Sequence, residues 1–200
     1  MYYTGLSRGE ALALTVNNVD FNAKKLRINK SLDIGDNTPQ VKDTKTKAGV
    51  REIPMPDTLC GELMGYVKNL KSIYLFPNKN GELSSRSSFR RMLDRIMRKT
   101  KETAERIKSD FDNDVMSGTE DFVVSFTPHT FRHTYATNLY YAGIDVKKSQ
   151  YYLGHSTIEM TLKIYTHLDN TRNEKEYTDK LNKFFSQSKI SQNRKIVKIG

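Results

Sequence analysis

Residues 127–154, TPHTFRHTYATNLYYAGIDVKKSQYYLG, carry the strongest structural signal in the chain. The leading threonine can cap a helix whose first position is proline, because proline lacks the amide that a first helical turn leaves unpaired. This helix is expected to run to about Tyr141 and to stop at Gly143. A second helix is expected over 146–153, with Gly154 as its stop. The sequence therefore predicts two short helices joined by a glycine turn.

Short strands are expected upstream of these helices. Runs separated by Asn, Asp and Gly predict a small antiparallel sheet from segments near Val19–Phe21, Lys25–Asn29, Gln40–Lys42 and Arg51–Pro54. Lys45 and Lys47 lie in the last connection, where Gly49 suits a hairpin turn, so both charges are expected at a loop tip. Ahead of the strands, Ser7 and Glu10 have the spacing of a helix capping box.

Two longer helices are expected in the middle of the chain. The first can be capped by Asp57 and has apolar residues every three or four positions as far as Leu70. The second runs from Ser84 to about Ile107 and has one apolar face. Its remaining surface is rich in arginine, at Arg86, Arg90, Arg91, Arg95 and Arg98. These arginines form either a solvated helix surface or a phosphate-binding surface, and both interpretations stay open.

The C-terminal part continues the helical pattern. Ser156 and Glu159 repeat the capping-box spacing before a helix over 160–167, whereas residues 110–121 are acidic and indicate an insertion. From Asn170 onward the chain is polar and basic. The predicted fold is α+β, mostly helical with a small antiparallel β-sheet near the N-terminus. Residues 1–169 are expected to form one domain, and 170–200 a C-terminal helix and basic tail.

Length and composition limit the class of protein. A chain of 200 residues suits one domain with a tail. Lys and Arg number 33 against 23 Asp and Glu, and the net charge of +10 makes a polyanion the expected partner. No apolar run approaches the roughly 20 residues of a membrane span, and the first residues are unlike a signal peptide. Cys60 is the only cysteine and cannot form an internal disulfide, so a cytoplasmic protein with no membrane partner is expected.

Five basic and aromatic residues are suited to phosphate chemistry: Lys45, His129, Arg132, His155 and Tyr165. A phosphodiester reaction needs cationic donors around the nonbridging oxygens, an acid for the departing alkoxide, and a nucleophile. A tyrosine hydroxyl is a poor nucleophile at pH 7 unless cations and a base assist it. His129 and His133 are four residues apart, a spacing that lets two histidines on a helix share a zinc ion. No third ligand is evident, so no metal site is expected. No carboxylate cluster for magnesium is apparent either.

Several sequence strings resemble the tyrosine recombinase, or phage integrase, catalytic domain. The second half of that domain is matched by Thr127-Pro-His-Thr-Phe-Arg-His-Thr-Tyr-Ala-Thr, Tyr152-Leu-Gly-His-Ser and Ile164-Tyr-Thr-His. The first half is matched by Tyr3-Thr-Gly-Leu-Ser-Arg-Gly-Glu-Ala-Leu and Thr44-Lys-Thr-Lys-Ala-Gly-Val-Arg-Glu-Ile-Pro. The likeness is strongest to integrases of conjugative transposons and low-GC phages. A type IB topoisomerase uses similar chemistry, but the Leu-Gly-His-Ser and Ile-Tyr-Thr-His strings favour a recombinase.

The resemblance implies site-specific DNA cleavage and rejoining through a 3'-phosphotyrosine. Tyr165 would attack a DNA phosphate, and Arg132 and His155 would hold its nonbridging oxygens. His129 would be the acid/base partner of the tyrosine, and Lys45 would protonate the leaving 5'-oxygen. These residues are expected to converge on one concave basic face. Because the phosphotyrosine stores the bond energy, the resemblance implies no cofactor and no metal.

The family likeness also implies partners. Double-stranded DNA would be held by Lys47, Arg86, Arg90 and Arg91, and Lys47 is in addition an alternative to Lys45 as the proton donor. Further copies of the chain would assemble on DNA in a tetrameric synapse. The apolar residues of the tail would dock either on a neighbouring subunit or on their own domain; they are Leu181, Phe184 and Phe185.

Two departures from the family pattern bear on activity. The pattern reads Thr-Gly-Leu-Arg, and its arginine is a second phosphate clamp. Here Ser7 has that position, and Arg8 lies one residue further, about 100° around a helix. Losing such a donor costs on the order of 10²-fold in rate, so impaired cleavage is expected. The chain also starts at this segment, which predicts N-terminal truncation, whether by numbering from an internal methionine or by decay of a mobile element. The alternative function is a non-catalytic DNA-binding or subunit-interaction remnant.

Overall fold

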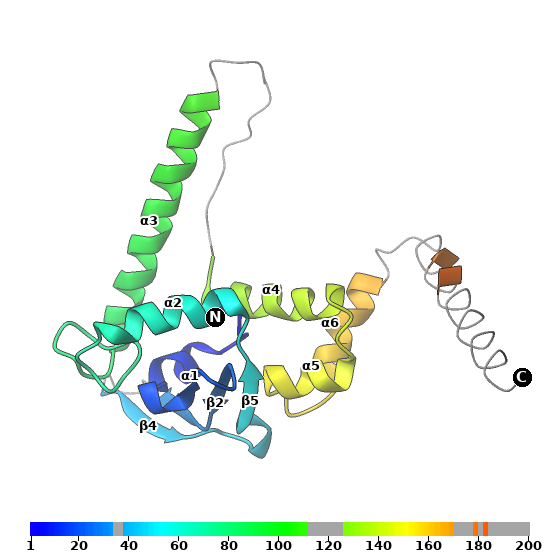
Figure 1. Ribbon diagram of the computed structural model, residues 1–200, viewed down its shortest axis with the longest axis horizontal. Coiled ribbons are helices and arrows are strands. Elements are labelled where there is room, and N and C mark those ends of the chain that lie inside the picture. The colour runs from blue at the N-terminus through cyan, green and yellow to red at the C-terminus, as the bar shows by residue number, and fades with distance from the viewer. Residues whose placement is uncertain (34–37, 112–125, 170–177, 180–181, 184–200) are drawn as a thin grey trace, which may run out of the picture. The chain divides into compact units, whose positions relative to one another are not determined.

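The computed structural model describes residues 1–33, 38–111, 126–169, 178–179 and 182–183 (Figure 1). The chain divides into two compact units, Met1–Leu162 and Lys163–Gly200. The helices are α1 (Arg8–Ala13), α2 (Asp57–Lys68), α3 (Arg86–Phe111), α4 (Pro128–Tyr141), α5 (Val146–Leu153) and α6 (Glu159–Asp169). The strands are β1 (Val19–Asp20), β2 (Lys25–Ile28), β3 (Lys30–Asp33), β4 (Gln40–Asp43) and β5 (Arg51–Pro54), with 3₁₀ turns η1 (Val16–Asn18) and η2 (Lys47–Gly49). The α+β fold, mostly helical with strands near the N-terminus, is confirmed.

The strands form two small sheets where one was predicted. β2 pairs antiparallel with β1 and with β5, and β3 pairs antiparallel with β4. Only one residue separates β3 from β2, but β3 pairs with β4 and so belongs to a second sheet. The segment from β4 to β5 therefore joins two sheets, and the prediction that Lys45 lies at the tip of a hairpin is wrong. Gly49 is needed for space, since a Cβ there would lie 2.5 Å from Cβ of Thr44.

The core of the first unit lies between these sheets and the helices. Alternate residues of β2 and β5 point inward, and the side chains of Leu26, Ile28 and Ile53 are at most 2% exposed. α1 packs on β3, α5 packs on β5, and α4 packs on α5. Helices from late in the chain thus cover strands from its beginning, which brings residues distant in sequence to one place.

The ends of α4 and α5 follow the predicted signals. The Thr127 hydroxyl accepts a hydrogen bond from the amide of Thr130 at 3.1 Å, and proline occupies the first helical position. α5 ends at Gly154, whose φ of +65° is the left-handed conformation that favours glycine. The bounds of both helices are therefore set by local sequence.

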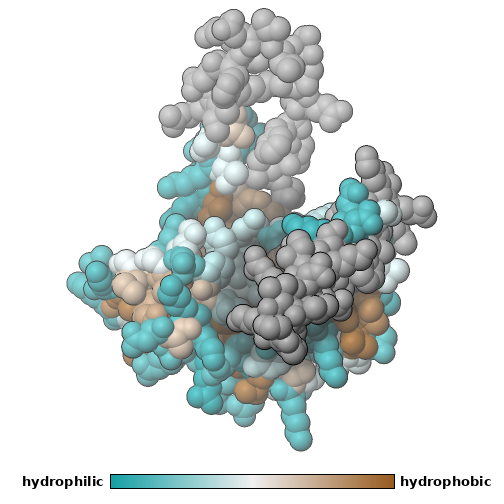
Figure 2. Space-filling view, turned by 45° about the vertical axis from the view of Figure 1, so that its right-hand side comes forward, coloured by the Kyte–Doolittle hydropathy of each residue, from teal (hydrophilic) through white to brown (hydrophobic). Residues whose placement is uncertain are grey.

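α3 begins against the core and presents both apolar and charged side chains. Phe89 is 6% exposed and packs with Leu12 and Leu32, whereas Met92 and Ile96 on the same face are 39% and 44% exposed. Hydrophilic side chains cover much of the helix in the view of Figure 2, with a hydrophobic patch toward its base. Within the described residues, no helix is both long and apolar enough to cross a membrane. Most of the acidic insertion, 112–121, and the three tail anchors lie outside the described residues.

Candidate functional site

A buried ion pair between Glu10 and Arg51 underlies the candidate site. Arg51 opens β5, faces inward like Ile53 and has a fully buried side chain. Its Nη1 and Nη2 donate to Oε1 and Oε2 of Glu10 at 2.6 and 3.1 Å. Its Nε donates to the carbonyl of Tyr152 at 2.8 Å, and Nη1 also donates to the carbonyl of Gly49 at 3.0 Å. One guanidinium therefore joins α1, the start of β5 and the end of α5.

The Glu10 carboxylate remains ionised in this setting. Burial alone would raise its pKa, but the hydrogen bonds and charge of Arg51 outweigh burial and lower the pKa. The amide of Ser7, which donates to Oε2 at 2.8 Å, and the charge of Arg132 act in the same direction. The site thus contains one fixed negative charge, the Glu10 carboxylate, which lies next to Arg51 and Arg132.

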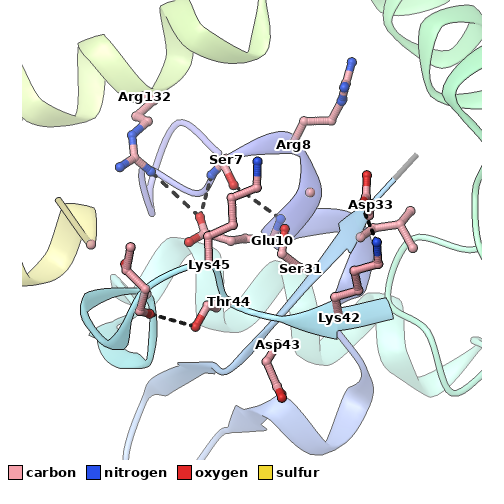
Figure 3. Close-up of a pocket in the computed structure, with 15 residues that line it drawn as sticks. Ser7, Arg8, Glu10, Ser31, Asp33, Lys42, Asp43, Thr44, Lys45 and Arg132 are labelled. Atoms are coloured by element: carbon pink, nitrogen blue, oxygen red, sulfur yellow. Dashed lines mark hydrogen bonds and ion pairs between the residues drawn. The ribbon is translucent and has the colours of Figure 1, made fainter. Parts of the chain in front are cut away.

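Arg132 on α4 is held by backbone carbonyls. Its Nη1 donates to the carbonyl of Gly5 at 2.9 Å, and its Nη2 donates to the carbonyl of Leu153. Nη1 also lies 3.8 Å from Oε2 of Glu10 (Figure 3). Burial lowers the pKa of Arg132, but an arginine stays protonated in proteins. The Arg132 side chain is 17% exposed, and its guanidinium is therefore a charged group whose orientation is fixed.

His155 follows Gly154 directly and is buried beside the start of α6. Its amide donates to the carbonyl of Gln150 at 3.1 Å, and the side-chain amide of Gln150 donates to the carbonyl of His155 at 3.1 Å. Its Nδ1 lies 2.9 Å from Oγ1 of Thr161. Both backbone and ring are thus restrained.

The imidazole of His155 is neutral at pH 7. Burial, followed by the charges of Arg132 and Arg51, lowers its pKa from 6.5 to about 4. His133 lowers the pKa further, whereas Glu10 raises it. His155 is therefore close enough to both arginines to feel their charge, and it can donate or accept a hydrogen bond without carrying a positive charge.

A cavity of about 530 Å³ lies next to Arg132. Figure 3 shows residues of its lining, which come from α1, from β3 and β4, from the segment after β4, and from α4. Lys45 and Arg132 both belong to this lining, whereas Lys47 does not. Of the two rival lysines, the structure places Lys45 on the arginine's cavity and Lys47 in the adjoining 3₁₀ turn.

Ser7 caps α1 at the edge of this cavity. Its hydroxyl accepts from the amide of Glu10 at 3.3 Å, and the carboxylate of Glu10 accepts from the amide of Ser7, as a capping box requires. Arg8 is exposed, and Figure 3 shows its guanidinium directed away from Glu10 and Arg132. In this structure Arg8 does not occupy the side of the helix that faces Arg132.

The other predicted residues are not among those that line this cavity. His129 is exposed, and its ring centroid lies 5.6 Å from that of His133. Arg86, Arg90 and Arg91 are exposed on the first turns of α3. Tyr165 lies on the part of α6 that belongs to the second compact unit. In the described part of the chain, no three His, Cys, Asp or Glu side chains gather in a group that could hold a metal ion.

Sequence reasoning missed three residues that build the cluster. The sequence alone predicts a capping role for Glu10 and a place in a strand for Arg51. The available signal was the strand alternation, which places Arg51 on the same side as Ile53 and so predicts a buried arginine that needs a carboxylate. No sequence signal indicates a role for Thr161 beyond its place six residues after His155. Its contact with the His155 ring depends on where α6 begins.

The comparisons with known proteins agree with this architecture. The model of the phage integrase family matches residues 1–172, and the chain therefore belongs to that family, whose catalytic domain is of the tyrosine recombinase type. A transposase from transposon Tn916 of Enterococcus faecalis is 30% identical over 176 residues, covering 82% of this chain and 40% of the relative. A XerC-like tyrosine recombinase of Caldanaerobacter subterraneus subsp. tengcongensis is 26% identical, covering 82% of this chain and 43% of the relative.

A solved structure of the Tn1549 transposon integrase is similar throughout most of the chain. It has a TM-score of 0.69 and 27% identity, and the match covers 92% of this chain and 56% of that one. That integrase was solved in complex with transposon right end DNA. The chain thus spans about half or less of the length of the proteins it resembles.

Proposed function

We propose that this chain provides the DNA-cleaving part of a site-specific recombinase, which breaks and rejoins double-stranded DNA through a 3'-phosphotyrosine. The observation that carries the proposal is the fixed, partly exposed guanidinium of Arg132 on a cavity shared with Lys45 and close to neutral His155. Guanidinium and imidazole donors are the groups that stabilise charge on the nonbridging oxygens of a reacting phosphate. The DNA-bound integrase of similar fold supports DNA as the substrate.

The reaction replaces one ester bond to the DNA phosphate, the bond to the 5'-oxygen, by another, the bond to tyrosine. The Tyr165 hydroxyl transfers its proton to a base, for which His129 is the candidate, and its oxygen attacks the phosphorus. The bond to the 5'-oxygen breaks, and Lys45 gives that oxygen a proton. The products are a 3'-phosphotyrosine and a free 5'-hydroxyl, and the reverse steps with another strand's 5'-hydroxyl rejoin the DNA.

A non-catalytic role in DNA binding or subunit interaction is the second candidate. It is favoured by Ser7, which is used as a helix cap where the family has an arginine, and by the outward direction of Arg8. With one guanidinium in place of two, the cavity has less charge to oppose the negative charge that develops at the phosphate. On this interpretation the chain keeps the fold and the basic surface but cleaves DNA poorly.

Trapping on a nicked suicide substrate separates the two candidates. A recombinase becomes covalently joined to DNA, and Tyr165→Phe abolishes the covalent product. Ser7→Arg is expected to raise that product by at least about tenfold, the scale of a restored oxyanion donor, with little change in DNA affinity. Ser7→Ala is the matched control, because it loses the same cap without adding a charge.

Each outcome bears on one candidate. Cleavage that is absent in both the unmodified chain and Ser7→Arg, with fold and DNA binding intact, would reject the catalytic proposal and leave the binding role. Efficient cleavage by the unmodified chain would instead show that Ser7 is not a defect.

A further inference from the structure

The hydroxyl of Thr161 lies in an enclosed position on α6. Thr161 is 0% exposed, and its Oγ1 is 2.9 Å from Nδ1 of His155. Within the described residues this ring nitrogen is the only side-chain hydrogen-bond partner of that hydroxyl. The Thr161 hydroxyl is therefore shielded from water, so its hydrogen needs an acceptor within the protein.

Other helical threonines in the chain use their hydroxyls differently. Thr100, Thr103 and Thr134 each donate to the carbonyl four residues earlier, at 2.9, 2.9 and 3.0 Å. That bond is the usual use of a threonine hydroxyl in a helix. Among the described residues Thr161 makes no such bond, so its hydrogen is available for His155.

Only one of the two possible proton arrangements satisfies both groups. If Nδ1 of His155 carried the proton, the Thr161 oxygen would accept it, and the hydroxyl hydrogen would be buried without an acceptor, which costs free energy. If the hydroxyl donates, Nδ1 accepts and the ring proton is on Nε2. We propose that Thr161 is a positioning residue that donates to Nδ1 and holds His155 in the tautomer with its proton on Nε2.

This assignment deepens the proposed function and rests on it for its role in cleavage. Within the described residues Nε2 has no hydrogen-bond partner, so in this tautomer it is a free donor. A phosphate oxygen accepts hydrogen bonds, and a ring with its proton on Nδ1 would present a lone pair to it instead. The low pKa of His155 fits the same arrangement, because a neutral ring donates from Nε2 only in this tautomer.

The ring nitrogens can be observed directly in the full chain without DNA. Long-range ¹H–¹⁵N NMR at pH 7 on histidine-labelled protein distinguishes a protonated from an unprotonated ring nitrogen. We expect Nδ1 of His155 to be unprotonated and Nε2 protonated, with His155→Gln assigning the signals. A wild-type spectrum with the proton on Nδ1 would overturn the proposal.

Two substitutions test whether Thr161 is the cause. Thr161→Val keeps the shape and removes the hydroxyl, so the single tautomer should be lost to a mixture. Thr161→Ser keeps the hydroxyl and should retain the wild-type pattern even if packing is loosened. Thr100→Val, which removes an exposed helical hydroxyl far along α3, is the control and should change nothing. An unchanged tautomer in folded Thr161→Val would reject the role of the hydroxyl.

Cleavage of the suicide substrate adds an independent readout. Thr161→Val should reduce covalent product by about tenfold, by analogy with the loss when a residue that orients a metal-bound histidine is removed, and Thr161→Ser should restore most of it. If wild-type protein has the expected tautomer but neither it nor Ser7→Arg forms covalent product, the proposed function fails while the tautomer assignment stands. If cleavage is normal and the tautomer differs, only the present inference fails.

Discussion

Arg51 illustrates how a residue outside the cavity lining can define the site. Its fully buried charge is acceptable only because Glu10 and two carbonyls satisfy its hydrogen bonds. The same carboxylate lies 3.8 Å from Arg132. Two guanidinium groups therefore share one anion: loss of Glu10 leaves the buried Arg51 charge without a carboxylate, and loss of Arg51 leaves Glu10 with only the more distant Arg132.

Arg51→Met is expected to lower the free energy of unfolding by about 3–5 kcal/mol, the usual cost of breaking a buried ion pair from one side. Urea unfolding measures this change. The double variant Glu10→Gln with Arg51→Met should recover part of the loss, because it also removes the Glu10 charge that Arg51→Met leaves with only Arg132, 3.8 Å away. Arg27→Met is the control: Arg27 is exposed on the adjacent strand, and the change should be within about 0.5 kcal/mol. Equal losses in the two single arginine variants would contradict the role of the ion pair.

The low pKa of His155 predicts acid sensitivity. The pKa is about 4 in the folded protein against an ordinary value of 6.5, so between these values the unfolded chain binds a proton that the folded protein does not. The free energy of unfolding should therefore fall as the pH is lowered from 6.5 to about 4. Burial is the main cause of the low pKa of His155; the charges of Arg132, Arg51 and His133 lower the pKa further, and Glu10 opposes them.

Urea midpoints measured across that pH range test the prediction. His155→Gln removes the titration and should give a flatter profile than wild type. His167→Gln removes an exposed histidine and should leave the slope as it is. Glu10 adds its own loss at lower pH, below its ordinary pKa of 4.5, because its pKa is also lowered by folding. Parallel profiles for wild type and His155→Gln would show that this imidazole does not titrate as described.

At the scale of elements, the end of α5 does more than stop a helix. Gly154 adopts a φ of +65°, and a Cβ there would lie 2.6 Å from Nη1 of Arg51. The glycine thus gives the Arg51 guanidinium room to reach Glu10. The last turn of α5 also supplies the carbonyls of Tyr152 and Leu153 to the two arginines.

Gly154→Ala should destabilise the protein more than Gly143→Ala. Both glycines have φ in the left-handed region, where a side chain costs about 1–2 kcal/mol. Nothing lies within 4 Å of a Cβ at Gly143, so that variant measures the backbone cost alone. The difference between the two losses, measured by urea unfolding, reports the clash with Arg51. Equal losses would mean that the guanidinium moves aside freely.

Local signals predicted the helices better than the sheets. Thr127, Pro128 and the two stop glycines act within a few residues, so the bounds of α4 and α5 could be derived from the sequence. The division into two sheets could not be derived from the sequence, because it depends on which strands pair with β2. The buried pair of Glu10 and Arg51 was hidden for the same reason: each charge is ordinary locally and becomes specific only when segments 41 residues apart meet.

At the scale of the whole molecule, the net charge of +10 and the exposed arginines of α3 favour an electrostatic interaction with DNA. Replacing Arg86, Arg90 and Arg91 by alanine should weaken binding to duplex DNA and reduce the dependence of log affinity on log salt. The expected reduction in this slope is about 0.9 for each phosphate that the protein no longer neutralises. Fluorescence anisotropy over a series of salt concentrations measures it.

A matched control uses three exposed lysines elsewhere, Lys68→Ala, Lys71→Ala and Lys79→Ala, which lower the net charge by the same amount. The control should leave the salt dependence nearly unchanged. If both triple variants behave alike, the arginines of α3 are a solvated surface and the affinity comes from net charge.

The hydrogen bond from Arg132 to Gly5 joins residues 127 apart in sequence, and that from Arg51 to Tyr152 joins residues 101 apart. Contacts of such long range require closure of large loops, which costs conformational entropy. During synthesis, a ribosome-bound chain that ends before α4 contains Ser7, Glu10, Lys45 and Arg51 but neither Arg132 nor His155. A nascent chain therefore completes the cluster of Glu10, Arg51, Arg132 and His155 only after α5 and His155 have emerged from the ribosome.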